Sequence, residues 1–95
     1  MKSKLKLSEP ALADIKAILS FYAADGQDLR KEFMFDFRDA ANSIQSFPEA
    51  WPEMDGIRRK LMGRFPYAVL FSIEDGYISL LRVFHTSRQP GSWKK

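Results

Sequence analysis

Residues 58–93, RRKLMGRFPYAVLFSIEDGYISLLRVFHTSRQPGSW, decide the fold, because strand-forming runs alternate there with basic side chains. Apolar and aromatic residues dominate 67–73 and 77–85, and the tripeptide Glu-Asp-Gly at 74–76 separates these two runs. Glycine tolerates the positive φ that tight hairpins demand, so the tripeptide predicts a β-hairpin. With a preceding strand over 57–62, the segment predicts a three-stranded antiparallel meander.

Two turn lengths can connect this hairpin, and they place Arg82 on different faces of the sheet. A three-residue turn over 74–76, with its glycine left-handed, pairs Ala68 with Arg82. A two-residue Asp-Gly turn sets Arg82 beside Val69 and Phe71 on the apolar face. Burying an unpaired charge is costly, so we favour the three-residue turn. The face away from the core then carries seven residues: Ala68, Leu70, Ser72, Ile78, Leu80, Arg82 and Phe84.

The first half of the chain predicts one strand followed by two helices. Residues 4–7 alternate polar and apolar, as a half-buried strand does. Ser8 is the expected cap of a helix whose apolar residues recur every three to four positions until Asp-Gly at 25–26. Asp28 is the expected cap of a second helix, which Phe-Pro at 47–48 ends. The short connection predicts an antiparallel helical hairpin.

The whole chain of 95 residues reads as one α+β domain with the element order β-α-α-β-β-β. Its two helices are expected to pack on one face of the sheet. Residues 47–56, with prolines at 48 and 52, predict an ordered loop from helices to sheet. A composition of 45% hydrophobic and 28% charged residues is typical of a soluble globular protein.

Charge is distributed unevenly along the chain. Residues 1–57 carry seven Lys/Arg against ten Asp/Glu, whereas residues 58–95 carry eight against two. The basic half suits an anionic partner. The chain has no cysteine, which excludes disulfides and thiolate metal sites, and no apolar block typical of a signal peptide or membrane span. We expect a cytoplasmic protein with no cofactor, no metal and no membrane partner.

Two motifs carry a resemblance to a known family. GRFPYAV at 63–69 and LRVFH at 81–85, followed by Ser-Arg-x-Pro at 87–90, resemble the RelE/ParE superfamily of toxins from type II toxin–antitoxin modules. The resemblance extends over the whole chain. It implies a cytoplasmic toxin neutralised by a cognate antitoxin, whose extended or helical segment wraps the toxin. Together with the antitoxin, such toxins often bind their own operator DNA.

The superfamily contains two activities. Ribonuclease members cleave messenger RNA on the ribosome without a metal, using basic side chains on the sheet and usually an arginine and a tyrosine. Arg59, Lys60 and Arg88 match this pattern in part and would be the catalytic residues of such an endoribonuclease. However, the position after the strand tyrosine holds Ala68 instead of arginine, and Trp93 stands near the C-terminus where those enzymes carry a tyrosine.

These departures favour the ParE-like branch, whose members bind DNA gyrase, trap cleaved DNA and perform no chemistry of their own. The expected partner-binding residues lie in the basic half of the chain: Arg58, Arg59, Lys60, Arg64, Arg82, His85, Arg88 and Trp93. A ribosome-dependent ribonuclease is the alternative, and an inactive module that only binds the antitoxin is a third interpretation.

Several of these residues also have a structural interpretation. The basic run at 58–60 is typical of an edge strand that resists aggregation. Arg82 could form an ion pair with an acidic helix residue or with the antitoxin. His85 could be a hydrogen-bonded structural residue. On the second predicted helix, the Met-Phe pair at 34–35 broadens the apolar stripe. This pair either packs against the first helix or forms a patch for another chain.

Overall fold

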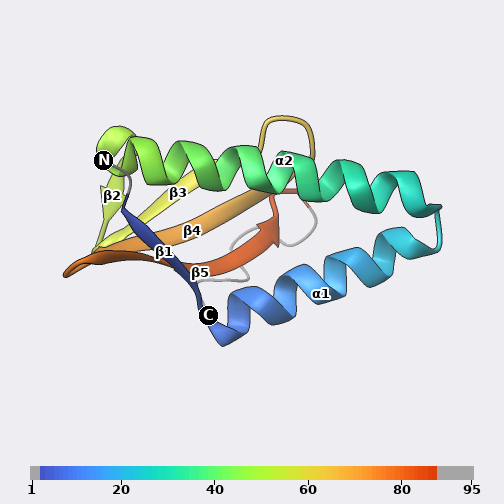
Figure 1. Ribbon diagram of the computed structural model, residues 1–95, viewed down its shortest axis with the longest axis horizontal. Helices are drawn as coiled ribbons and strands as arrows, with labels where there is room; N and C mark the ends of the chain where they lie inside the picture. Colours follow the sequence, from blue (N-terminus) through green and yellow to red (C-terminus); the bar gives the residue numbers. More distant parts are fainter. Residues whose placement is uncertain (1–2, 88–95) are drawn as a thin grey trace.

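The computed structural model describes residues 3–87, in which two helices cover one face of a five-stranded sheet (Figure 1). The predicted α+β architecture is confirmed, although the sheet is mixed. Its strand order is β1-β5-β4-β3-β2, with β1 parallel to β5 and the other neighbours antiparallel. The elements in chain order are β1 (Lys4–Leu7), α1 (Glu9–Ala23), α2 (Gln27–Ser46), the 3₁₀ helix η1 (Pro48–Ala50), β2 (Glu53–Met54), β3 (Ile57–Leu61), β4 (Tyr67–Glu74) and β5 (Tyr77–His85).

Local signals set the ends of the two helices. Ser8 caps α1 as predicted, because its Oγ accepts a hydrogen bond from the backbone N–H of Ala11 at 3.1 Å. The prediction that Asp28 caps α2 is wrong. Gly26, with φ of 115°, is the N-cap, and Asp28 lies in the first turn, where its charge favours the helix dipole. The tight connection makes the antiparallel hairpin visible in Figure 1.

The segment 47–56 is more regular than the expected loop. It holds the 3₁₀ helix η1 and the short strand β2, which pairs with β3 and forms one edge of the sheet. Trp51 from this segment is half-buried and packs against the core. The segment is therefore ordered, as predicted, and its two prolines do not prevent a two-residue strand.

The turn between β4 and β5 differs from the one we favoured. Glu74 lies opposite Tyr77, so the turn has two residues, and its Gly76 adopts a φ of 89°. A β-bulge follows, because Phe71 lies opposite Leu80 whereas the preceding residue of β4 lies opposite Arg82. The extra residue in β5 moves Arg82 away from the apolar face. The cost of burying that arginine is thus avoided by a bulge and not by a longer turn.

The bulge changes which residues face the helices. Ile78 and Leu80 are fully buried in the core, so their predicted place on the open face is wrong. Ser79 and Tyr77 lie opposite Ser72 and Glu74 and turn away from the helices instead. We call the side of the sheet that packs on the helices the helix face and the opposite side the outer face. The remaining expected residues are on the outer face as predicted: Ala68, Leu70, Ser72, Arg82 and Phe84.

The core lies between the helices and the helix face of the sheet. Its largest fully buried side chains come from both layers: Phe33, Phe71, Ile44, Ile78, Leu80 and Val69. An aromatic group joins the layers, since the rings of Tyr22, Phe33, Phe65 and Tyr67 pack mainly edge-to-face. Within residues 3–87, neither helix has the length and apolar character needed to cross a bilayer.

Candidate partner-binding surfaces

The basic run of β3 is divided between the two faces of the sheet. Arg58 and Lys60 lie opposite Phe71 and Val69, which places them on the helix face. Arg59 lies opposite a buried leucine of the outer face and is exposed. Successive side chains of a strand point to opposite faces, so three adjacent cations cannot form one patch. Of the three, Arg59 alone is exposed on the outer face.

Both helix-face cations of β3, Arg58 and Lys60, contact Trp51. Arg58 Nη1 donates a hydrogen bond to the Trp51 carbonyl oxygen at 2.6 Å, and Arg58 Nη2 lies 3.8 Å from Glu53. Lys60 Nζ lies 5.1 Å from the centroid of the Trp51 ring, a cation–π distance, and donates to the Leu61 carbonyl. These contacts fasten the segment before β3 to the sheet. Arg58 and Lys60 therefore have a structural role.

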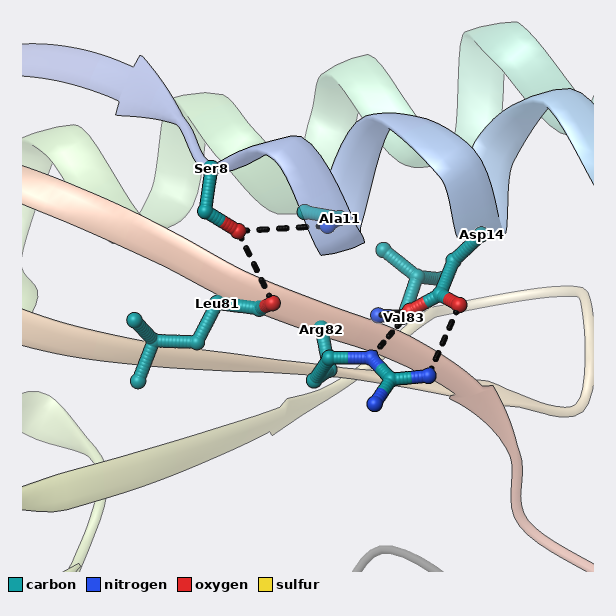
Figure 2. A network of polar contacts seen from close by, with 6 residues as sticks. All are labelled: Ser8, Ala11, Asp14, Leu81, Arg82 and Val83. Atoms are coloured by element: carbon teal, nitrogen blue, oxygen red, sulfur yellow. Dashed lines mark hydrogen bonds and ion pairs between the residues drawn. The ribbon is translucent and has the colours of Figure 1, made fainter.

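Arg82 is held by a carboxylate of α1, as Figure 2 shows. Arg82 Nε donates to Asp14 Oδ2 at 2.7 Å, and Arg82 Nη2 donates to Asp14 Oδ1 at 3.0 Å. This pair confirms the interpretation of Arg82 as the partner of an acidic helix residue. The hydrogen bond to Asp14 is the main cause that raises the pKa of Arg82 above its ordinary value, with partial burial opposing it and the Asp14 charge adding to it.

The first part of α1 and its N-cap Ser8 also form hydrogen bonds with the edge of β5 beyond the end of β1. Asp14 Oδ2 accepts a hydrogen bond from the Val83 N–H at 2.9 Å. Ser8 Oγ donates to the Leu81 carbonyl at 3.0 Å (Figure 2). The Ser8 N–H donates to the Leu80 carbonyl at 3.0 Å. Ser8, the N-cap of α1, and the Asp14 side chain therefore satisfy backbone groups of β5 around its bulge, past the last residue that β1 pairs with β5. Arg82 belongs to this closure.

Arg64 lies in the connection between β3 and β4, which a buried carboxylate shapes. Asp36 of α2 is 5% exposed and accepts hydrogen bonds from the N–H groups of Arg64 at 2.8 Å and Phe65 at 2.7 Å. The Arg64 guanidinium is exposed, 3.4 Å from Glu32. Sequence reasoning missed Asp36, although an acid between two core phenylalanines of one helix is a signal that it has a specific partner.

His85 ends β5 on the helix face, opposite Tyr67. The two rings pack edge-to-face with centroids 5.2 Å apart, and His85 Nδ1 accepts a hydrogen bond from the Ser87 N–H at 3.1 Å. These contacts suit a structural histidine, and a partner contact by His85 stays a prediction. Arg88 and Trp93, two further predicted site residues, lie outside the described residues.

The predicted site is therefore not one cluster among residues 3–87. Arg58 and Lys60 hold Trp51, Arg82 closes the edge of β5, and Arg59 and Arg64 are exposed in different places. Sequence reasoning anticipated only the Met-Phe pair of a second surface, a groove of about 560 Å³ on the helical hairpin. The groove is lined by Leu19, Arg30, Lys31, Met34, Phe35 and Arg38. Over the same described range, no group of three or more His, Asp or Glu side chains could hold a metal ion.

Comparison with known proteins identifies the family. The family described as the ParE toxin of the type II toxin–antitoxin system parDE matches residues 5–90. Among solved structures, one described as "Chromosomal ParDE TA system from P. aeruginosa" superposes with a TM-score of 0.76 at 24% identity, covering 88% of this chain and 96% of that one. No curated protein sequence matched significantly. The likeness confirms the fold, and the match over 5–90 confirms the resemblance and the ParE-like branch: the chain belongs to the ParE toxin family of type II toxin–antitoxin systems.

Proposed function

We propose that this toxin binds DNA gyrase in the cytoplasm, traps cleaved DNA and is neutralised by a cognate antitoxin. Membership of the ParE toxin family supports a toxin paired with an antitoxin. The similar solved structure is described as a ParDE toxin–antitoxin system, which supports the same pairing. The choice of target rests on how the basic side chains of β3 are placed.

The observation that carries the choice is that Arg59 and Lys60 lie on opposite faces of β3. Metal-independent RNA cleavage needs several cations that converge on one phosphate as its negative charge develops. Two adjacent strand residues on opposite faces cannot do so, and Lys60 is already placed over the Trp51 ring. Ala68 is fully buried, and it stands where ribonuclease members carry arginine. This arrangement favours binding of a large partner over strand cleavage.

The proposed gyrase-binding residues are those of the basic half that this placement leaves for a partner. Arg59 is exposed on the outer face of the sheet, and Arg64 is exposed in the connection between β3 and β4. Arg88 and Trp93 remain part of the proposal on the grounds of sequence. Operator DNA is expected to bind only when the antitoxin is present.

A supercoiling assay with purified gyrase and relaxed plasmid tests the proposal. We expect the toxin to block supercoiling and to accumulate cleaved DNA, while messenger RNA stays intact in cells that express it. Arg59→Glu should weaken the block, whereas Lys4→Glu, an exposed strand cation at the opposite edge of the sheet, should not. Full supercoiling at saturating toxin would reject gyrase as the target.

The same experiment separates the other two interpretations. Ribosome-dependent cleavage of messenger RNA that disappears in Lys60→Gln or Arg88→Gln would establish the ribonuclease. Harmless expression of a folded protein that still binds its antitoxin would establish the inactive module. The combination of supercoiling, messenger RNA integrity and cell growth differs for each of the three interpretations.

A further inference from the structure

Part of the outer face is buried although both helices lie on the other side of the sheet (Figure 1). Ala68 is 0% exposed and Leu70 is 5% exposed, and both belong to the outer face of β4. The segments before and after β3 also turn toward the helices, where Trp51 packs against the core and Asp36 binds two backbone N–H groups. Within residues 3–87, therefore, neither helix and neither of these segments lies over the buried residues.

Neighbouring side chains of the sheet do not explain the burial of Leu70. Side chains on one face of a sheet stand side by side, so residues of adjacent strands flank a leucine without covering its end. Arg59 and Arg82 lie opposite Leu70 on either side. Arg59 is exposed, however, and the Arg82 guanidinium is bound to Asp14. The end of the Leu70 side chain is therefore shielded by another part of the chain.

The burial follows β4 and decreases along it. Exposure rises from 0% at Ala68 to 5% at Leu70 and 8% at Ser72, and Glu74 is exposed. We call the first three of these residues the β4 strip. Leu61 lies opposite Ala68 on the same face and is 53% exposed. The cover therefore begins near the start of β4 and does not extend to β3.

The N-terminal end of the chain does not reach the β4 strip. Lys4 lies opposite Tyr77, which in turn lies opposite Glu74. Glu74 is six residues from Ala68, which is about 20 Å in a strand. Residues 1–2 span at most about 7 Å, so they cannot cover the start of β4.

The C-terminal end of the chain starts beside the β4 strip and is long enough to cover it. The Thr86 N–H donates to the Pro66 carbonyl at 2.9 Å, so the chain leaves β5 next to the start of β4. Eight extended residues, 88–95, reach about 26 Å, whereas the β4 strip is about 13 Å long. Their sequence, RQPGSWKK, contains one large apolar side chain, Trp93.

We propose that residues 88–95 fold back along β4 and cover the outer face, with Trp93 packed on the β4 strip. A tryptophan side chain buries about 150–250 Å², so one indole is large enough to shield Leu70. The burial arises within a single chain, so neither a second copy nor a partner supplies it. A partner that approaches the outer face then meets the C-terminal segment before it meets β4.

Thiol accessibility tests the proposal in the full chain, which has no cysteine of its own. The thiol of L70C should react with a disulfide reagent about 10-fold more slowly than that of L61C, because only position 70 is covered. Adding Trp93→Ala should bring L70C within about 2-fold of L61C, whereas Trp93→Phe should retain most of the protection. L61C is the matched control, since Trp93→Ala should leave its rate unchanged. S72C serves as a second probe if L70C disturbs the fold, and circular dichroism checks each variant.

A disulfide cross-link provides an independent readout of where the segment lies. W93C combined with A68C, L70C or S72C should form an intramolecular disulfide in at least one of the three pairs, because the bond needs Cβ atoms about 3.8 Å apart. W93C combined with F35C, an exposed position on α2, is the control that should stay reduced.

Three results would overturn the proposal. Equal rates for L70C and L61C in the full chain would show that the β4 strip is not covered. Protection of L70C that survives Trp93→Ala would overturn the role of Trp93, and the absence of any cross-link to β4 would overturn the placement of the segment. Each measurement uses the toxin alone, so its result does not depend on whether gyrase is the target.

Discussion

Removing the Asp14 carboxylate should destabilise the fold more than removing its arginine partner. Asp14 accepts three hydrogen bonds, two from Arg82 and one from the Val83 N–H. Val83 is 3% exposed, so its N–H would lose its acceptor where water has little access. An unsatisfied buried donor costs about 1–3 kcal/mol, whereas an ion pair with a largely exposed partner contributes about 0.2–1 kcal/mol. The Arg82 side chain is 49% exposed, which places the pair in that weak class.

The free energy of unfolding should therefore fall by about 2 kcal/mol in Asp14→Ala, after about 0.5 kcal/mol is recovered from the higher helix propensity of alanine. In a domain of this size that loss corresponds to roughly 10 °C in the unfolding temperature. Asp14→Asn should cost about 1 kcal/mol, because its amide oxygen can still accept from Val83. Arg82→Ala should cost less than about 1 kcal/mol, because the backbone hydrogen bond survives.

Urea denaturation of the three variants, with hydrogen exchange at the Val83 amide, measures these differences. The raised pKa of Arg82 contributes stability that is present below the ordinary arginine pKa and is lost only as pH rises through the higher folded value. The cost of Arg82→Ala should therefore not fall as pH rises between about 6 and 9. The reasoning is refuted if Arg82→Ala costs as much as Asp14→Ala, or if Asp14→Ala costs less than about 0.5 kcal/mol.

Three further substitutions test other parts of the structure. Asp36→Ala should lower the free energy of unfolding by about 3 kcal/mol in urea titrations, because two backbone N–H groups lose a buried acceptor; a neutral result would contradict that role. Gly76→Ala should cost about 1 kcal/mol in thermal melts through its φ of 89° alone, since nothing lies within 4 Å of an added Cβ, and an unchanged melting temperature would argue against this turn. Trp51→Ala should remove the contact with Lys60 and speed proteolysis within 47–56, whereas equal cleavage rates would show that the Trp51 ring adds little to the local stability of this segment.

The order of elements could be predicted because it rests on local signals. Ser8 before a Glu-Pro start, the Asp-Gly pair at 25–26 and the proline at 48 each act within a turn of the helix end that they mark. The bulge could not be predicted in the same way. Leu80 and Val83 are both buried in the core although they are three residues apart, and in a regular strand residues at that spacing point to opposite faces. One extra residue in β5 turns both side chains to the same face. The need for this extra residue comes from packing against the helices, which no local pattern encodes.

The candidate site was harder to predict than the fold. The basic run of β3 looked continuous in sequence, yet the pleat of the strand sends Arg59 to the outer face and Lys60 to the helix face. Asp36 was missed because its donors, the N–H groups of Arg64 and Phe65, are 28 and 29 residues away. Of the groove on the helical hairpin, only the Met-Phe pair at 34–35 was recognised from the sequence. The groove forms only in the folded chain, where Leu19 of α1 lies beside the lining residues of α2.

Hydrophobic period, capping residues and turn residues were enough to specify the α+β class, the helical hairpin and the meander, since each acts over a few neighbouring residues. The family resemblance likewise lay in short motifs. The availability of Arg82 for a partner depended on a contact between distant parts of the chain. Arg82 is 68 residues from Asp14, and no local pattern predicts that the two meet. A side chain's charge is read from its own identity, but its freedom to bind is set by the acceptors that folding brings to it.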